Sequence, residues 1–418
     1  MSAARAGVAG PEPLPASLKT MLRRAQRRRK TLAVLLIAPL LLFLLVNFVL
    51  PVGLVLLRSV DDRAVAVVLT RTAPAIVDWR GDGVPGEAVF AAFHADLRDA
   101  QAARNVTILA NRLNIEKAGF QALVTRTARV AAATQAGSSA SSALIAIDAR
   151  WGQRETWLAV RRAAAPFTAV YLLAAFDLTL DDEGSLVEVP EQRRLFKTVW
   201  LRTFWIAGVI TLLCVVLGYP LAHFLASAPP RLANILMILV LLPFWTSLLV
   251  RTTAWVALLQ TEGVVNDLAL VVGLVSERTQ MIRNRFGVYV TMTHVLLPYM
   301  VLPLYGVMKR VPPTYMRAAS SLGANPLRAF LKIYLPLTLH GVGAGAALVF
   351  ILAVGFYITP ALVGGPNDQM ISYYVAYYTN ESLNWNGAAA LSVCLLVFTA
   401  ALFWMFNRLF GLDRLKIG

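Results

Sequence analysis

The sequence predicts an all-α polytopic membrane protein with six transmembrane helices and an extra domain inserted between the first two. Hydrophobic residues make up 58% of the 418 residues and charged residues only 15%, compared with about 25% in soluble domains. Uncharged apolar runs recur along the chain, and a helix that crosses a bilayer needs about 20 such residues. One stretch, residues 58–197, differs because it holds most of the acidic residues.

The apolar runs define the predicted membrane helices. Their ranges are 31–57, 200–226, 232–258, 286–308, 337–360 and 386–408. Residues 130–147 are uncharged but rich in Ser, Ala and Gln, and residues 163–176 are too short, so neither is predicted to cross the membrane. The first run also resembles a signal peptide, but it is longer than a signal-peptide core, and we predict an uncleaved helix.

Basic residues beside these helices indicate the orientation, because cytoplasmic loops of membrane proteins are enriched in Lys and Arg. The tail 1–30, the loop 309–336 and the C-terminal end are basic, whereas the loop 361–385 contains no Lys or Arg. The loop 259–285, with three Arg, is an exception. We therefore expect both termini in the cytoplasm and residues 58–197 outside the membrane.

The inserted stretch predicts a small domain with helices and, in places, strands. Residues 97–134 have a helical pattern, whereas residues 142–148 and 169–189 favour strands, the latter with a turn at DDEG. An α+β fold is compatible with this mixture. Docking of an extracytoplasmic partner is a hypothesis that rests only on the predicted location.

The sequence DWRGDG at 78–83 raises the possibility of a calcium loop. Such a loop needs oxygen ligands at its third and twelfth positions, but Arg80 and Val89 occupy them. A turn at Gly81 and Gly83 is the better interpretation.

Composition also bears on other functions. The net charge of +16 is compatible with nucleic-acid binding. However, the basic residues lie in the tail and loops without interleaved aromatic residues, so we predict no nucleic-acid partner. Cys214 and Cys394 lie within apolar runs and are expected to be packed thiols. No metal-binding spacing of His or Cys is found, and no metal site is predicted.

The loop 309–336 contains start and stop signals for two short helices that are joined by one turn. Pro312 and Pro313 suit a helix start, and Gly323 suits the left-handed residue that ends a helix. Asn325 and Pro326 then suit the start of a second helix. These residues are equally compatible with a docking surface for a partner and with an amphipathic loop that lies on lipid.

The same stretch resembles a known family. The spacing Ala318-Ala319-x3-Gly323-x9-Ile333-x-Leu335-Pro336 is similar to the EAA loop of binding-protein-dependent ABC transporter permeases, with Arg317 where the family usually has Glu. LGYPLAHFLA at 217–226, LLPFWTSLLVRTTAWVALL at 241–259 and the first helix also resemble the spermidine/putrescine permease subfamily. The resemblance covers the first helix and residues 198–418, but not residues 58–197.

The resemblance implies the type I permease fold of ABC importers in the bacterial inner membrane. It implies that the loop 309–336 couples to a cytoplasmic ABC ATPase dimer, which binds ATP and Mg, and that a second, different permease subunit and a periplasmic substrate-binding protein complete the transporter. The chain itself has no GxxxxGK[ST] sequence, so it is expected to be a transporter subunit without enzymatic activity or cofactor. The residues implied in coupling are Arg317, Ala318, Ala319, Gly323, Ile333, Leu335 and Pro336.

By resemblance the substrate is a polyamine or a similar small solute, with an opine or a metal complex as the alternative. Recognition of a polyamine calls for carboxylates and aromatic faces, and the YYVAYY run at 373–378 supplies aromatic rings near the outer end. The candidate path residues are Trp245, Tyr299, Tyr357, Asp368, Tyr374 and Glu381. Aromatic residues are also common at membrane interfaces for anchoring alone.

Three features of the predicted helices bear on mechanism. Arg251 is a charge inside a predicted span, and we favour a structural role for it at the interface between permease subunits. Gly341, Gly343 and Gly345 have the spacing of a close helix contact, and residues 355–360 predict a break. An ATP-independent secondary transporter would call for intramembrane ionisable residues or inverted repeats, and a membrane-bound sensor would not need the EAA-like loop.

Overall fold

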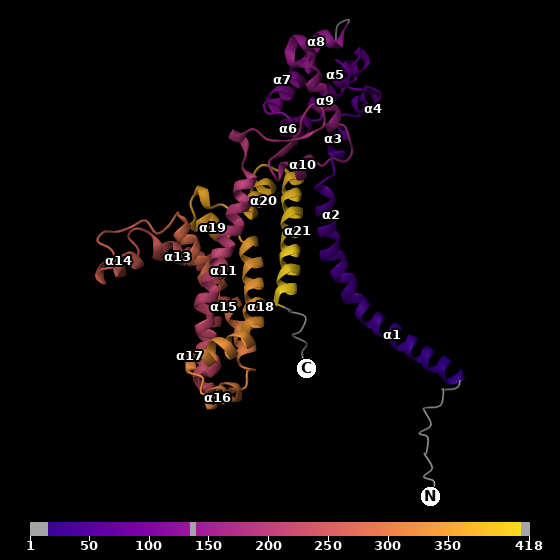
Figure 1. Ribbon diagram of the computed structural model, residues 1–418. Coiled ribbons are helices and arrows are strands. Elements are labelled where there is room, and N and C mark those ends of the chain that lie inside the picture. Colours follow the sequence, from indigo (N-terminus) through magenta and orange to yellow (C-terminus); the bar gives the residue numbers. More distant parts are fainter. Residues whose placement is uncertain (1–15, 134–138, 411–418) are drawn as a thin grey trace. The chain divides into compact units, whose positions relative to one another are not determined.

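The computed structural model describes residues 16–133 and 139–410, and most of these residues are helical (Figure 1). The chain divides into two units, one that ends at Leu57 and one that begins at Arg58. Parts of the predicted basic tail 1–30, and the basic residues Arg414 and Lys416, lie outside the described residues.

The first unit contains one long apolar helix, in agreement with the predicted range 31–57. It consists of α1 (Ala16–Leu44), a π-helical turn η1 (Leu45–Val49) and α2 (Leu50–Arg58). Residues Arg28–Arg58 are long and apolar enough to cross a membrane. The π-helical turn follows Pro39 by about two turns of helix.

The second unit begins with residues 58–195, which precede α11 and which we call the insert. Its helices are α3 (Arg63–Ala66), α4 (Thr72–Val77), α5 (Glu87–Ala102), α6 (Val106–Glu116), α7 (Phe120–Ala133), α8 (Ala140–Ile147), α9 (Arg154–Ala163) and α10 (Val170–Ala174), with 3-10 turns η2 (Ala149–Gly152) and η3 (Glu191–Arg193). Strands β1 (Leu178–Leu180) and β2 (Leu186–Glu188) form an antiparallel hairpin, with Thr179 opposite Val187.

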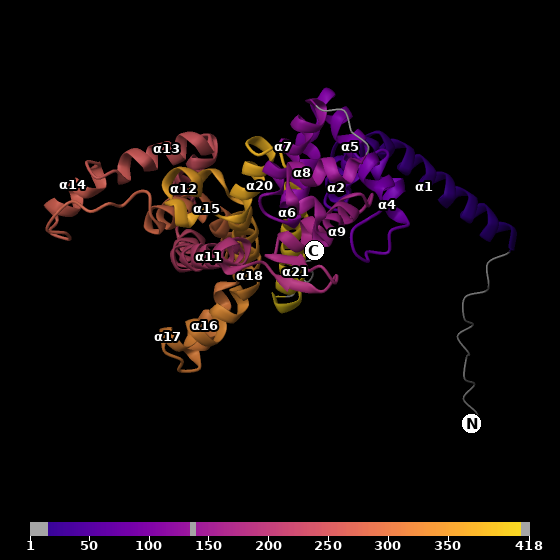
Figure 2. The same ribbon diagram turned by 90° about the horizontal axis from the view of Figure 1, so that it is seen from above.

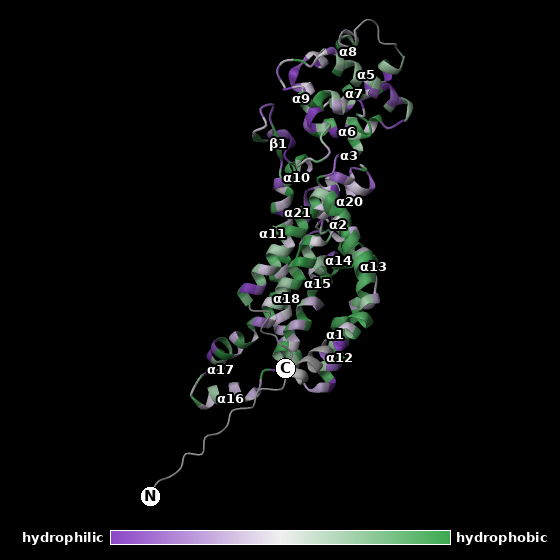
Figure 3. Cartoon of the chain, turned by 90° about the vertical axis from the view of Figure 1, so that its right-hand side faces the viewer, coloured by the Kyte–Doolittle hydropathy of each residue, from purple (hydrophilic) through white to green (hydrophobic). Residues whose placement is uncertain are grey.

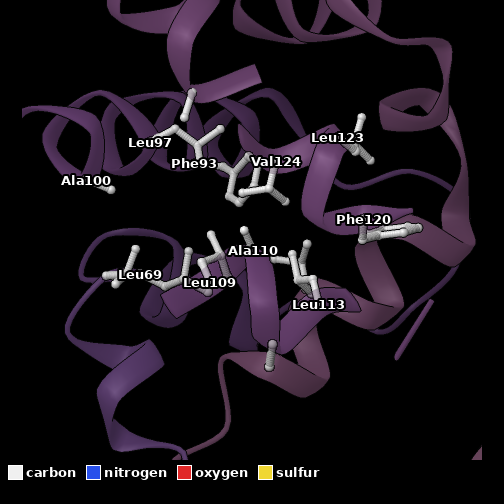
Figure 4. Packing of buried hydrophobic residues seen from close by; sticks show 14 of the residues in the cluster. Leu69, Phe93, Leu97, Ala100, Leu109, Ala110, Leu113, Phe120, Leu123 and Val124 are labelled. Carbon is white, nitrogen blue, oxygen red and sulfur yellow. The ribbon is translucent and has the colours of Figure 1, made fainter. Parts of the chain in front are cut away.

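Packing between helices forms a separate hydrophobic core in the insert. In Figure 4, Phe93, Leu97, Leu109, Leu113 and Val124 point toward one another from α5, α6 and α7, and all of them are buried. Trp151 and Trp157 add large buried rings, both close to the ring of Phe93, at centroid distances of 4.8 and 5.3 Å. A core of this kind allows the insert to hold its shape.

One strand prediction in the insert was wrong, and the other was wrong in its first part but correct for residues 178–188, which contain β1 and β2. Residues 142–148 lie mainly in helix α8, and residues 170–174 form helix α10. The side chain of Ser139 accepts a hydrogen bond from Ser142 N and caps α8, which favours a helix over a strand. Short apolar runs do not distinguish a buried helix from a buried strand. The predicted hairpin turn was correct, with Gly184 at φ +85°.

The remaining part of the second unit is the membrane core, residues 196–410. Its longer helices are α11 (Phe196–Ser227), α12 (Pro230–Leu241), α13 (Leu248–Leu259), α15 (Arg285–Met308), α18 (Leu335–Gly355) and α21 (Trp385–Phe410). Its shorter elements are η4 (Leu242–Trp245), α14 (Val264–Val271), α16 (Pro313–Ser321), α17 (Pro326–Ala329), η5 (Phe330–Tyr334), α19 (Ile358–Val363), η6 (Pro366–Asp368) and α20 (Ile371–Asn380). The core helices are mostly apolar, whereas hydrophilic residues are more frequent on the insert and on α16 and α17 (Figure 3).

Five helices in the described residues are long and apolar enough to cross a membrane, and a bent pair makes a sixth candidate. The prediction of six spans therefore holds if the pair counts as one. The prediction of a single straight helix over 232–258 was wrong, because η4 and α13 meet at a bend of 99°. Thr246 is extended, and Ser247 Oγ accepts a hydrogen bond from Val250 N and caps a new helix. α12, α13 and α14 lie to one side of the bundle (Figure 2).

Glycines on α18 allow the close helix contact that their spacing predicts. A Cβ atom at Gly345 would lie 2.6 Å from Met300 Sδ on α15, and one at Gly343 would clash with the Phe410 ring on α21. Such distances leave no room for a side chain. The helix α18 ends at Gly355, five residues earlier than predicted, and the predicted break lies at Phe356 and Tyr357.

Candidate functional site

Residues 309–336, which we call the hairpin loop, form two short helices as the sequence predicts. α16 begins at Pro313 and is followed by Gly323 at φ +82°. The side chain of Asn325 accepts a hydrogen bond from Arg328 N at 2.8 Å and caps α17. The π-helical segment η5 then leads directly into α18, so the hairpin loop is joined to a membrane helix without a flexible linker.

One face of the hairpin loop is available for contact. Arg317, Ala318 and Gly323 are exposed, and Leu322 is 89% exposed. Arg317 makes no ion pair with any residue in the described chain. An exposed Leu between small residues and a free guanidinium group is a surface suited to a protein partner.

The other predicted loop residues face the core or border it. Ala319 is buried, Ile333 and Leu335 are half-buried, and Pro336 is exposed at the start of α18. Half-buried side chains on η5 and the first turn of α18 hold the second arm of the hairpin loop against the core. The predicted loop residues thus divide into an exposed face and residues that lie against the core.

At the opposite end of the core, near the insert, three tyrosines line a pocket of about 590 Å³, which we call the tyrosine pocket. Its lining residues are Gly364, Gly365, Pro366, Gln369, Tyr373, Tyr374 and Tyr377. The rings of Tyr373 and Tyr377 are nearly parallel, 6.4 Å apart, whereas the Tyr374 ring is perpendicular to that of Tyr373.

The charged groups around the tyrosine pocket are mainly basic. Asp368 is 5% exposed and does not line the pocket. Its carboxylate accepts hydrogen bonds from Arg285 Nε at 3.0 Å and Gly365 N at 3.1 Å, so it supports the backbone around the pocket. Arg202 donates to the carbonyl oxygen of Gln369 at 3.2 Å. The buried Oε1 atom of Gln369 has no hydrogen-bond partner among the described residues and is an open acceptor.

The structure does not bring the predicted path residues together. Tyr374 lines the tyrosine pocket, whereas Glu381 follows α20 and is exposed. Trp245 is 89% exposed at the bend after α12, and Tyr299 packs on Phe244 at a centroid distance of 4.8 Å. Tyr357 lies at the break after α18 and is 40% exposed.

Gln369 was not among the predicted site residues. A single Gln gives no distinctive sequence signal, because its pocket depends on the fold of residues 364–377. Tyr373 and Tyr377 belong to the noted YYVAYY run, but the sequence alone did not distinguish them from interfacial anchors.

Arg251 lies on α13 with two guanidinium nitrogens buried and without a hydrogen-bond partner among the described residues. Nearby, Trp255 Nε1 donates to His294 Nδ1 at 3.1 Å. Buried charged nitrogens without acceptors are costly, so the surroundings of Arg251 are incomplete in the isolated chain.

These features define a polytopic membrane protein with a transport-permease core. Residues 215–410 match the family described as binding-protein-dependent transport system inner membrane component. The chain is 32% identical over 234 residues to the spermidine/putrescine transport system permease protein PotB of Escherichia coli K12, covering 55% of this chain and 83% of that protein. It is a member of this inner-membrane permease family.

Two further comparisons gave matches. The PotB protein of Haemophilus influenzae is 29% identical over 226 residues, covering 53% of this chain and 79% of that protein. The crystal structure of a bacterial ABC transporter involved in the import of the acidic polysaccharide alginate is 16% identical, with a TM-score of 0.45, covering 54% of this chain and 81% of that chain. The family match does not include the insert.

Proposed function

We propose that this chain is the permease subunit of an ATP-driven ABC importer for polyamines such as spermidine and putrescine. The observation that carries the proposal is its similarity to relatives named spermidine/putrescine permeases, which extends over about four-fifths of their length. The exposed face of the hairpin loop supports coupling to a separate ATPase dimer, which would bind ATP and Mg. The chain acts as a transporter subunit and not as an enzyme.

The tyrosine pocket is the proposed entry point for the solute. An ammonium group is attracted to aromatic faces, and Gln369 Oε1 is a free acceptor for its N–H groups. Since Asp368 is already paired with Arg285, the tyrosine rings and this amide supply most of the attraction. The other candidate path residues, Trp245, Tyr299, Tyr357 and Glu381, would contact the solute later or only in the complete transporter.

One observation favours a second candidate solute. Arg202 and Arg285 lie beside the tyrosine pocket, and both guanidinium groups hold its backbone or its supporting carboxylate. Positive charge at this point favours an anionic solute, such as an anionic opine or an anionic metal complex, over a cation. The two solute classes therefore differ in the sign of their charge, and uptake experiments can separate them.

The proposed partners follow from the same assignment. A second, different permease subunit completes the path, and the incomplete surroundings of Arg251 support a subunit contact near α13. A periplasmic substrate-binding protein delivers the solute, and membrane lipid surrounds the core. The hairpin loop and both termini face the cytoplasm, whereas the insert lies in the periplasm.

Uptake by a deletion strain tests this proposal. Cells that lack the chain should lose uptake of radiolabelled spermidine, and the full chain should restore it. Unlabelled putrescine should compete, whereas the anions molybdate and nopaline should not. Vanadate should stop uptake, whereas an uncoupler applied with ATP maintained should not. Loss of molybdate or nopaline uptake in place of spermidine uptake would favour the anionic solute. Uptake that an uncoupler abolishes while ATP is maintained would favour a secondary transporter.

A further inference from the structure

Helix α11 holds the hairpin loop at one of its ends. The hydroxyl groups of Tyr219 and Thr338 share a hydrogen bond of 2.9 Å. The His223 ring lies edge-on to Tyr334 and Phe330, at centroid distances of 4.9 and 5.9 Å. Phe330 and Tyr334 are the first and last residues of η5, which joins the hairpin loop to α18. These contacts connect the second arm of the hairpin loop to α11 as well as to α18.

The other end of α11 holds the insert. The buried carboxylate of Asp177 accepts hydrogen bonds from the backbone N–H groups of Leu195, Phe196 and Lys197, at 3.1, 3.1 and 2.7 Å. These groups would otherwise lack partners at the start of the helix. Asp177 belongs to the insert, so the insert itself caps α11.

Aromatic packing strengthens this junction. Trp200 Nε1 donates to the carbonyl oxygen of Ala175 at 2.9 Å, and the Phe176 ring stacks on the Trp200 ring at 6.1 Å. Both Phe176 and Trp200 also contact Phe398 on α21. A second attachment is made by Asn386 Nδ2, which donates to the carbonyl oxygen of Asp61 at 2.7 Å. The insert is thus fixed to the core at several points.

Between these ends, α11 is one helix of 32 residues that runs from α10 to α17 in Figure 1. Along its length it packs on α15 and α18, and Ile206, Ile210 and Cys214 are fully buried there. A helix supported in this way transmits displacement along its length, since packed elements shift as bodies and do not deform continuously.

We propose that α11 makes the insert and the hairpin loop move together as one body during the transport cycle. Tyr219 and His223 are positioning residues for the loop, and Asp177 and Trp200 are positioning residues for the insert. This inference rests on the proposed function, because an ATPase must move the loop. It also assigns the insert a role: a ligand that stabilises one position of the insert changes the affinity of the ATPase for ATP, by the reciprocity of coupled sites.

Distance measurements by electron paramagnetic resonance test this inference. Spin labels are placed at Arg129→Cys on the insert and Leu322→Cys on the hairpin loop, both at exposed positions, after replacement of Cys214 and Cys394 by Ala. A second pair joins Arg129→Cys to a cysteine on the outer face of the second permease subunit. The full transporter is measured in nanodiscs without nucleotide and after trapping with ATP and vanadate.

We expect the first distance to stay unchanged, while the second changes by several ångströms, on the order of 5 Å. Combined replacement of Asp177→Asn and Trp200→Phe should broaden the first distance distribution. Trp205→Phe is the matched control, because Trp205 lies on the same helix but is 62% exposed, and it should have no such effect.

Two results would overturn the inference: a first distance that changes as much as the second, or a second distance that stays constant. The rate of ATP hydrolysis, measured on the same samples, tests the proposed function separately. If the complex hydrolyses ATP only in the presence of this chain, the proposed coupling stands whichever way the distances behave. If it does not, the proposed function fails, and the movement of the insert fails with it.

Discussion

Thr338 Oγ1 accepts a hydrogen bond from the hydroxyl group of Tyr219 at a distance of 2.9 Å. The direction follows from the surroundings, because the Thr338 hydroxyl group donates its own hydrogen to the carbonyl oxygen of Tyr334 or Leu335. Tyr334 is the last residue of η5 and Leu335 is the first residue of α18, where the hairpin loop ends. A polar contact within the apolar core therefore connects the loop, α18 and α11.

Removal of this contact should weaken coupling more than folding. Tyr219→Phe keeps the ring and loses one hydrogen bond, worth about 1 kcal/mol, which corresponds to about a fivefold loss of uptake if the bond acts in the coupled state. ATP hydrolysis per molecule of solute should rise. Tyr305→Phe is the control, since the Tyr305 hydroxyl group has no hydrogen-bond partner among the described residues. Equal uptake by both variants would contradict the assignment of Tyr219.

Gly323 should be intolerant of β-branched residues. Its φ of +82° is strained for any residue with a branched Cβ, at a cost of about 1–2 kcal/mol or more. Space does not limit the substitution, because a Cβ atom would have no neighbour within 4 Å. Gly323→Val should abolish uptake while membrane insertion is retained, and Gly323→Asn should keep most uptake because Asn tolerates this conformation. Wild-type uptake by the Val variant would contradict the role of the hairpin loop.

The sequence predicted local features better than features that depend on tertiary contacts. The turn at Gly323 and the cap at Asn325 depend on neighbouring residues, and both are confirmed. The bend at Thr246 was not predicted, because the run contains no charged residue there, although Pro243 and the cap residue Ser247 are local signals for a break. Hydropathy measures whether a segment can leave water, and it is insensitive to the direction of the helix axis.

The candidate site shows the same limit. Tyr374 was predicted and lines the tyrosine pocket, whereas Asp368 was predicted as a path residue and is paired with Arg285, 83 residues away in the chain. No spacing in the sequence reveals an ion pair of that separation. The insert shows the same limit of sequence-based prediction. Its short apolar runs are helices that pack on a core assembled from residues distant in the sequence.

Arg317 should interact with an acidic group on the ATPase. It is exposed and makes no ion pair within the described chain, and it occupies the first position of the contact face. Arg317→Glu would place two negative charges together, and uptake should fall severalfold in low salt and less in high salt. Arg317→Lys is the control and should keep most uptake. An unchanged rate for Arg317→Glu would show that this position tolerates either sign.

Arg112 should be essential for the stability of the insert. Its guanidinium group is buried, donates to the Asp62 carboxylate, and pairs with Glu116 at 3.0 Å. Burial raises the pKa of Asp62, and Arg112 opposes that effect. Arg112→Leu leaves the buried carboxyl group of Asp62 without its cation, whereas Glu116 keeps its ion pair with Arg162 at 2.9 Å. The expected cost is about 3–5 kcal/mol. Limited proteolysis of the full chain should cleave the insert of this variant faster, whereas the exposed control Arg129→Leu should resist like the wild type.

Asp148 should make the stability of the insert depend on pH in the acidic range. Its hydrogen bonds from the Arg150 side chain lower the pKa of Asp148 to about 2, and burial opposes that effect. Because the folded-state pKa lies below the ordinary value of 3.8, the contribution of Asp148 is fully present above about pH 4 and is lost as the pH falls toward 2.

The difference in insert melting temperature between the wild type and Asp148→Asn should therefore shrink as the pH falls from 5 to 2. It can be followed in the detergent-solubilised chain by the fluorescence of the buried Trp151 and Trp157. Arg150→Gln removes the partner and should reproduce the effect. A difference that stays constant over this range would show that the ion pair between Asp148 and Arg150 does not stabilise the insert.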